Sequence, residues 1–160
     1  MSKPLVVILM GSKADIAHCQ KIADAAVSFG LEAQMRIGSA HKTAQHTFNL
    51  LQAYEADPRP KVYITVAGRS NALSGFTDGA VSAPVIACPP ESEAFGGADV
   101  FSSLRMPSGA APAVVLEPVN AALLAAKILA LADPQVLEAV KAYQRAQAEK
   151  LTQDDVLLAA

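Results

Sequence analysis

Five consecutive residues combine groups suited to proton transfer and to anion binding: Ser39-Ala40-His41-Lys42-Thr43. They follow an apolar run and precede a helical pattern, which places them in a loop between a strand and a helix. The imidazole of His41 titrates near neutral pH and suits general acid–base catalysis, and Lys42 adds a positive charge. The alternative is a histidine that only decorates the surface. The combination favours a site for a small anionic metabolite.

Two more strand ends carry polar residues, and each has two interpretations. In Gly11-Ser12-Lys13-Ala14-Asp15, serine and aspartate are favoured helix caps, but the free N–H groups of a helix start also bind anions. It is not a Walker phosphate loop, because the second glycine and the Lys-Ser/Thr pair are absent. Gly68-Arg69-Ser70-Asn71 is either a plain helix start or a ligand contact, since glycine permits close backbone approach. The residues alone leave both questions open.

The remaining polar residues of interest give weaker signals. His18 and His46 lie inside predicted helices, where we expect solvated or partly packed side chains. Cys19 falls on a predicted core face, and Cys88 has no evident basic partner, so we expect neither thiol to be a nucleophile. The polar stretch at 102–109 lies in a long loop, and such loops are commonly lids or interface pieces. Its role stays open.

Short apolar runs alternate with helical patterns along the chain. Strands are expected at 5–10, 31–37, 62–67, 84–88 and 113–116. Helices are expected at 15–29, from about 43 to Pro58, shortly after Asn71, for one turn near 99–104, and at 120–132 and 134–152. The predicted core face of the first helix carries Ile16, Cys19, Ala23 and Val27, and that of the second carries Ala44, Phe48 and Leu51.

This alternation predicts an α/β fold: a doubly wound parallel sheet in a three-layer αβα sandwich of the flavodoxin-like or Rossmann-like kind. We expect a single domain over 1–160, with its core at about 4–132 and a C-terminal helix at about 134–152. The loops 11–15, 38–43, 68–71 and 88–93 all follow strands and should converge at one sheet edge, where open α/β sheets bind ligands.

Composition narrows the function classes. The 160 residues are 52% hydrophobic and 18% charged with a net charge of −2, and no basic stripe suggests nucleic acid. The longest apolar run, 121–132, contains Lys127 and is too short to span a bilayer, so no membrane partner is expected. No signal-peptide pattern precedes Leu5, and two cysteines without metal spacing indicate a reducing cytoplasm and no metal site.

The C-terminal helices carry more apolar surface than one subunit is expected to hide. The helix at 120–132 is apolar nearly all round, and we expect the next one to pack on a neighbouring subunit through Val136, Val140 and Tyr143. Hiding such surface in an interface is favourable at about 25 cal/mol per Å². A homo-oligomer with closed symmetry, a tetramer or octamer, is expected.

Several motifs together resemble the family of aminoimidazole ribonucleotide (AIR) carboxylases and mutases of purine biosynthesis. The resemblance covers about 4–132 and rests on Met10-Gly11-Ser12 with Asp15, on Ser39-Ala40-His41, on the third loop and on 120–126. The mutase branch typically has Gly-Gly-x-Ala-His-Leu-Pro-Gly in the third loop and Ser-Ala-His-Arg earlier. This chain has Ala-Gly-Arg-Ser-Asn-Ala-Leu-Ser-Gly at 67–75 and Lys42 after His41. With Ala87-Cys88-Pro89-Pro90 and 102–109, it looks like the direct carboxylase branch, class II.

The resemblance implies reversible carboxylation of AIR by carbon dioxide to 4-carboxyaminoimidazole ribonucleotide (CAIR), with no cofactor: no biotin, metal or nucleoside triphosphate. The AIR ring is an electron-rich enamine whose C4 attacks carbon dioxide without a protein nucleophile. The protein must supply a dry pocket, aligned reactants and a group that removes the C4 proton. His41 fits that role.

The resemblance also assigns the binding residues. Gly11, Ser12 and Asp15 would hold the phosphate and ribose, with Ser39 and Lys42 beside them, and Gly68, Arg69, Ser70 and Asn71 would line the carboxyl pocket. Ala14 stands where many relatives have serine, and the absent second histidine of the mutase motif disfavours the mutase alternative. A non-catalytic flavodoxin-like binding module is the remote alternative. The acidic cluster and phospho-accepting aspartate of receiver-like modules are missing, and aromatic residues for flavin stacking are only 5% with no Trp.

Overall fold

The structure is a computed structural model that describes residues 2–158. Its centre is one sheet of five parallel strands in the order β2-β1-β3-β4-β5. The strands are β1 (Leu5–Met10), β2 (Glu32–Ile37), β3 (Lys61–Val66), β4 (Val85–Ala87) and β5 (Ala113–Val114). All five predicted strands exist, and the predicted doubly wound parallel sheet is confirmed.

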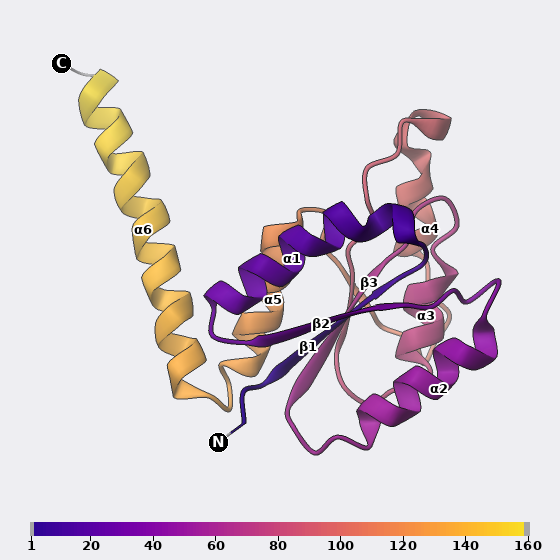
Figure 1. The fold of residues 1–160 in the computed structure, drawn as a ribbon. Helices are drawn as coiled ribbons and strands as arrows, with labels where there is room; N and C mark the ends of the chain where they lie inside the picture. The colour runs from indigo at the N-terminus through magenta and orange to yellow at the C-terminus, as the bar shows by residue number, and fades with distance from the viewer. Residues whose placement is uncertain (1, 159–160) are drawn as a thin grey trace.

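Helices cover both faces of the sheet (Figure 1). They are α1 (Ile16–Ser28), α2 (Ala44–Glu55), α3 (Ala72–Asp78), α4 (Phe101–Leu104), α5 (Pro118–Leu129) and α6 (Pro134–Leu158), with the 3₁₀ segments η1 (Lys13–Asp15) and η2 (Ala94–Val100). α1 and α5 lie on one face, and α2 and α3 lie on the other. None of the helices within residues 2–158 combines the length and the hydropathy that crossing a membrane requires.

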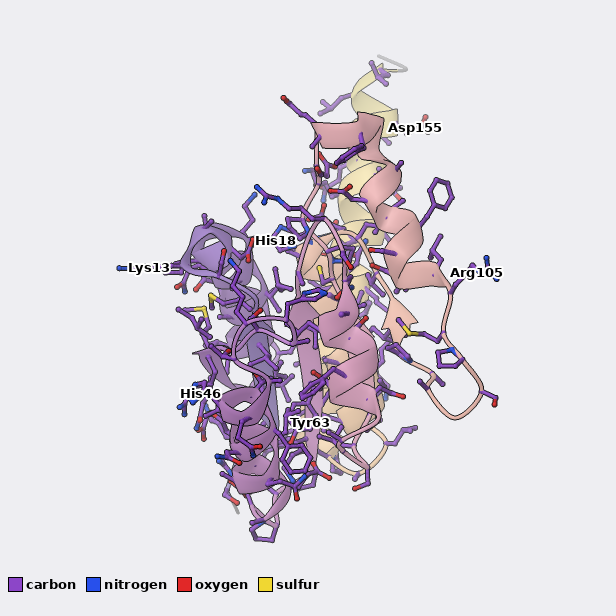
Figure 2. The ribbon with its side chains drawn as sticks, turned by 90° about the vertical axis from the view of Figure 1, so that its right-hand side faces the viewer. Lys13, His18, His46, Tyr63, Arg105 and Asp155 are labelled. Atoms are coloured by element: carbon purple, nitrogen blue, oxygen red, sulfur yellow. The ribbon has the colours of Figure 1, made fainter. Side chains whose placement is uncertain are left out.

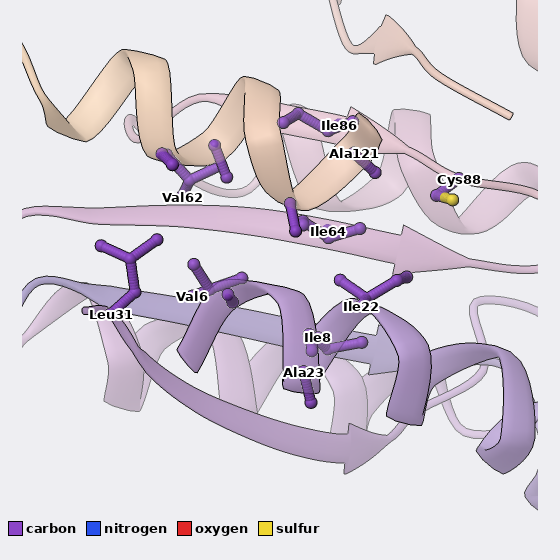
Figure 3. Close-up of a cluster of buried hydrophobic side chains, with 14 of the residues drawn as sticks. Val6, Ile8, Ile22, Ala23, Leu31, Val62, Ile64, Ile86, Cys88 and Ala121 are labelled. Atoms are coloured by element: carbon purple, nitrogen blue, oxygen red, sulfur yellow. The ribbon is translucent and has the colours of Figure 1, made fainter. Parts of the chain in front are cut away.

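The central strands are buried on both faces, as their continuous apolar runs predict. Every residue of β1 is buried, and successive side chains alternate between the two faces. Val6 and Ile8 face α1 and α5, where they pack with Ile22 and Ala121 (Figure 3). Leu5, Val7 and Leu9 join a second cluster with Leu51 of α2 and Leu73 of α3. Two hydrophobic layers therefore hold the strand ends in fixed positions.

The predicted core faces of α1 and α2 are partly wrong. Cys19 and Ala23 are buried in α1, but Ile16 and Val27 are 38% and 57% exposed. Their places in the core are taken by Ile22 and Ala26. In α2 the buried stripe is Thr47, Leu51 and Tyr54, while Ala44 is exposed and Phe48 is 42% exposed. The Thr47 hydroxyl donates to the Thr43 carbonyl at 2.9 Å. Because this bond satisfies the hydroxyl, Thr47 can face the core in place of the predicted Phe48.

The C-terminal residues expected to contact a neighbour pack instead within their own chain. Val136 and Val140 are 2% and 3% exposed in the main hydrophobic cluster, and the ring of Tyr143 meets that of Phe29 edge to face at 5.2 Å. This part of the assembly argument is therefore wrong. α6 also continues beyond the predicted end at 152 to Leu158, and all of 144–158 is exposed on a helix that points away from the sheet (Figure 1).

Candidate active site

The strand order of the sheet reverses direction between β1 and β3, which makes the carboxyl edge of these two strands a topological switch point. The strand order places β1 beside β3, while α1 and α3, which follow these strands, lie on opposite faces. Ligands of open α/β sheets bind at such a switch point, because the two loops separate there. Met10 is in register with both Ile37 and Val66, so the loops after β2, β1 and β3 start side by side.

Hydrogen bonds extend this alignment past the strand ends. The Gly11 N–H donates to the Val66 carbonyl and the Gly38 N–H to the Met10 carbonyl, both at 2.9 Å. The Cys88 N–H donates to the Thr65 carbonyl at 2.8 Å. These bonds join the fourth loop to the other three, and the predicted convergence of all four loops at one edge is confirmed.

The loop after β1 is a capping box. The Ser12 hydroxyl accepts from the Ala14 N–H at 3.2 Å, and Asp15 Oδ2 accepts from the Ser12 N–H at 3.2 Å and from its hydroxyl at 3.3 Å. The capping interpretation is therefore correct for both side chains. Ser12 is exposed and Asp15 half-buried, so capping leaves them accessible to a ligand at the start of α1. Their role in substrate binding stays a prediction.

The loop after β2 is a tight polar turn that displays His41 and Lys42. The Ser39 N–H donates to Thr43 Oγ1 at 3.0 Å, and the Lys42 N–H donates to Ser39 Oγ at 3.2 Å. The base of the turn needs Gly38, because a Cβ there would lie 2.8 Å from Thr47 Oγ1. The side chains of His41 and Lys42 are exposed at the tip. Ser39 thus supports the turn from within.

The loop after β3 is tied to a segment about thirty residues further along the chain. Arg69 has φ +61°, and its N–H donates to Asp99 Oδ2 at 3.1 Å. Asn71 is 2% exposed; its amide donates to Ser103 Oγ at 2.9 Å, and its carbonyl oxygen accepts from the Ser74 N–H at 3.2 Å. The Asn71 side chain thus caps α3 and anchors residue 103. A direct ligand contact by Asn71, like those of Gly68, Arg69 and Ser70, stays a prediction.

Cys88 does have a basic neighbour, contrary to expectation. His18 Nε2 lies 3.4 Å from Cys88 Sγ, which also donates to the Leu116 carbonyl at 3.6 Å. Burial lowers the pKa of His18 and raises the pKa of Cys88 to about 12. Burial likewise raises the pKa of Cys19 to about 12. The pair is neutral at physiological pH, so neither cysteine supplies a thiolate.

Other ionisable side chains are distributed over the molecule. Lys13, His46 and Arg105 are exposed and lie at the margins of the molecule in Figure 2, whereas His18 lies nearer its centre. Between residues 2 and 158, no group of three or more His, Cys, Asp or Glu side chains is placed to hold a metal ion.

Sequence reasoning missed the residues that support the third loop. Asp99, Ser102 and Ser103 contact residues 69–71 from a segment that we left without a role. His18 lies in a helix and is partly packed, as predicted, but its contact with Cys88 was not foreseen. No short-range pattern marks any of these four, because each contact joins residues that are 30 or more positions apart.

Comparison with known proteins agrees with this geometry. The family model described as AIR carboxylase matches residues 5–150. A phosphoribosylaminoimidazole carboxylase of Treponema denticola is 59% identical over 96% of both chains, and one of Archaeoglobus fulgidus is 52% identical over 93% of this chain and 82% of its own. The crystal structure of Treponema denticola PurE matches with a TM-score of 0.96 and 58% identity, over 98% of this chain and 99% of that one. The chain therefore belongs to the AIR carboxylase family.

Proposed function

We propose that the protein catalyses the reversible carboxylation of AIR at C4 by carbon dioxide, giving CAIR in purine biosynthesis without ATP. One observation supports this most directly: a member of the AIR carboxylase family exposes His41 and Lys42 at the carboxyl edge of its sheet, next to the switch point. The relatives with the highest identity quoted above are named as carboxylases, and Arg69-Ser70-Asn71 occupies the loop where the mutase branch carries its second histidine.

The proposed chemistry needs one proton-transfer group. C4 of AIR forms a bond to the carbon of carbon dioxide, and one C=O electron pair moves to oxygen to give a carboxylate. C4 then carries both the carboxylate and its hydrogen, and the ring nitrogens share the positive charge. The His41 imidazole removes this proton, and the C–H electron pair restores the aromatic ring. In reverse, the imidazolium protonates C4 and carbon dioxide leaves.

The other residues of these loops position the substrate. Ser12, Asp15 and Lys42 hold the ribose phosphate, and Gly68, Arg69 and Ser70 border the carboxyl group. Lysine interacts with phosphate as a point charge, whereas the arginine of the mutase motif would form a bidentate pair. Binding of the phosphate far from C4 supplies alignment, which lowers the entropic part of the barrier.

A substrate comparison tests the reaction. Purified protein is given AIR with dissolved carbon dioxide or the N5-carboxy isomer of CAIR, both without ATP. We expect CAIR from AIR and carbon dioxide. Conversion of the N5-carboxy isomer alone would show that the protein is a mutase.

Variants test the role of His41. His41→Asn should lower turnover by about 10²–10⁴-fold, since general acid–base groups contribute that much, while substrate binding survives. His46→Asn is the matched control, because His46 is an exposed histidine on α2, outside the 39–43 turn, and its replacement should leave turnover unchanged. Lys42→Ala should raise KM more than it lowers kcat, because a phosphate contact is made in ground and transition states alike. A His41→Asn variant within a few-fold of the unmodified protein would assign the proton to another group.

We further propose that the protein is a cytoplasmic homo-oligomer, a tetramer or octamer. The support is the outer part of α6, residues 144–158, which is exposed along its whole length; Leu151, Val156 and Leu158 in it are 71%, 63% and 89% exposed. A single helix of this length is marginal in water without tertiary contacts. Light scattering should give a closed oligomer, and removal of 144–158 should reduce its mass. A monomer at micromolar concentration would contradict the assembly.

A further inference from the structure

A residue with a side chain adopts a left-handed backbone conformation in the loop after β3. Arg69 has φ +61°, and within residues 2–158 only Phe95 is another non-glycine residue with positive φ. This conformation is unfavourable for a residue with a Cβ and persists only where its surroundings enforce it. Arg69 directly precedes the exposed Ser70 in the same loop at the carboxyl edge of the sheet. The enforcing contacts therefore also determine how Ser70 is presented.

Those contacts come from η2 and α4. The Arg69 N–H donates to Asp99 Oδ2 at 3.1 Å. The Ser102 hydroxyl donates to the Asp99 carbonyl at 2.7 Å, accepts from the Asn71 N–H at 3.0 Å and lies 3.4 Å from the Arg69 carbonyl oxygen. The amides on both sides of Ser70 are thus bound by one short segment. Ser102 fixes this segment internally and joins it to the loop.

Dense packing does not explain the conformation of the loop. A cavity of about 330 Å³ lies beside Asp99, bordered by Pro90, Gly97 and Val100. A Cβ added at Gly68 would lie at an ordinary 3.5 Å from Pro90 Cγ, so Gly68 is not tightly enclosed. The hydrogen bond to the carboxylate is consequently the specific contact that fixes the Arg69 amide.

We propose that Asp99 is a positioning residue for the carboxylation. It holds Arg69 in the left-handed conformation, so that Ser70 faces the carboxyl group that is added to or lost from the substrate. Asp99 itself does not contact the substrate. The inference rests on the proposed function, since it takes the loop after β3 as the border of the carboxyl pocket.

Three variants test this role. Asp99→Ala removes the acceptor, Asp99→Asn keeps an oxygen acceptor at the same place, and Glu93→Ala removes an equal charge from an exposed side chain that makes no capping bond at the start of η2. A hydrogen bond to a charged acceptor corresponds to a factor of about ten or more. Asp99→Ala should therefore raise KM for carbon dioxide about tenfold or more, with KM for AIR within twofold. Asp99→Asn and Glu93→Ala should stay within threefold of the unmodified protein.

A double-mutant cycle with Arg69→Gly isolates the backbone effect. Glycine adopts positive φ without the steric cost, so the conformation no longer depends on Asp99. In the Arg69→Gly background, Asp99→Ala should change KM for carbon dioxide by less than about threefold. Any loss caused by removing the guanidinium is present in both arms of that comparison and cancels.

Hydrogen exchange supplies a readout that does not depend on activity. The Arg69 amide should exchange at least about tenfold faster in Asp99→Ala than in the unmodified protein or in Glu93→Ala. Equal KM values for carbon dioxide in Asp99→Ala and the unmodified protein would overturn the inference, as would an equal effect of Asp99→Ala in both Arg69 backgrounds. If the unmodified protein does not carboxylate AIR, the proposed function fails, and unchanged exchange at Arg69 then separately refutes the role of Asp99 in fixing this loop.

Discussion

Replacement of Gly38 by alanine should disturb both the fold and the turn that carries His41. An added Cβ would lie 2.8 Å from Thr47 Oγ1, 3.2 Å from Thr47 Cγ2 and 3.1 Å from Leu9 Cδ1. Thr47 and Leu9 are buried at 0% and 1% exposure, so neither can move into solvent. The clash must therefore be relieved by a shift of the turn or of α2.

The expected loss of stability is the sum of two contributions. Overpacking a well-packed core costs about 1–3 kcal/mol, and weakening the 2.9 Å hydrogen bond from the Thr47 hydroxyl to the Thr43 carbonyl costs about 1 kcal/mol. We expect Gly38→Ala to lower the free energy of unfolding by about 2–4 kcal/mol. Turnover should fall as well, because His41 lies three residues after the substituted position.

Denaturant unfolding at one fixed protein concentration measures this change. Gly11→Ala is the stability control, because its Cβ would meet the nearest atom, Ala67 Cβ, at an ordinary 3.7 Å. Thr47→Ala removes both close atoms, so the double variant Gly38→Ala with Thr47→Ala should be more stable than the sum of the single changes predicts. A Gly38→Ala protein within about 0.5 kcal/mol of the unmodified one, or purely additive changes, would refute the steric argument.

Three other outcomes follow from the site. Ser12→Ala should lower the free energy of unfolding by about 1 kcal/mol, because the helix cap is lost. Ser12→Asp should keep the cap but raise KM for the substrate, because the new carboxylate repels the phosphate. An unchanged KM in Ser12→Asp would show that the phosphate binds elsewhere. Burial lowers the pKa of His18 below 6.5, so the imidazole binds a proton more readily in the unfolded chain than in the folded one. The contribution of His18 to the free energy of unfolding is therefore fully present above pH 6.5. It is lost as the pH falls below that value, by at most about 1.4 kcal/mol per pH unit. His18→Gln should flatten that dependence in denaturant titrations between pH 5 and 7, and an unchanged slope would contradict it. Burial also raises the pKa of Cys88 and of Cys19 to about 12, so iodoacetamide at pH 8 should modify both only after unfolding, as checked by mass spectrometry; rapid labelling of the folded protein would show an accessible thiolate.

The order and type of the elements followed from sequence because they depend on short-range patterns. The run Leu5–Met10 predicted β1 residue for residue, since only a strand covered on both faces tolerates six consecutive apolar side chains in this setting. The turn at 39–43 and the loop at 11–15 were found in the same way, because a polar stretch after such a run marks the functional edge of a parallel sheet. His41 was identified as the proton-transfer candidate from this position and its residue type.

Helix faces were less predictable because apolar character does not decide which side meets the sheet. Thr47 is buried while Phe48 is 42% exposed, and the choice depends on a hydroxyl that bonds its own helix backbone. The pattern likewise predicts a partner surface at Val136 and Val140, but the first turns of α6 pack on the core of their own chain. Only the packing of a complete set of elements resolves such choices.

Sequence by itself therefore determined the parallel sheet, the loops at its carboxyl edge and the residue types that those loops offer. Tertiary structure alone decided what holds these loops in place: His18 beside Cys88, and Asp99 bound to the amide of Arg69. The physical reason is sequence separation. A cap is formed by residues within a few positions and a buried strand is marked by its own apolar run, whereas these contacts join positions 70 and 30 residues apart, and only the closed fold brings them within hydrogen-bond distance.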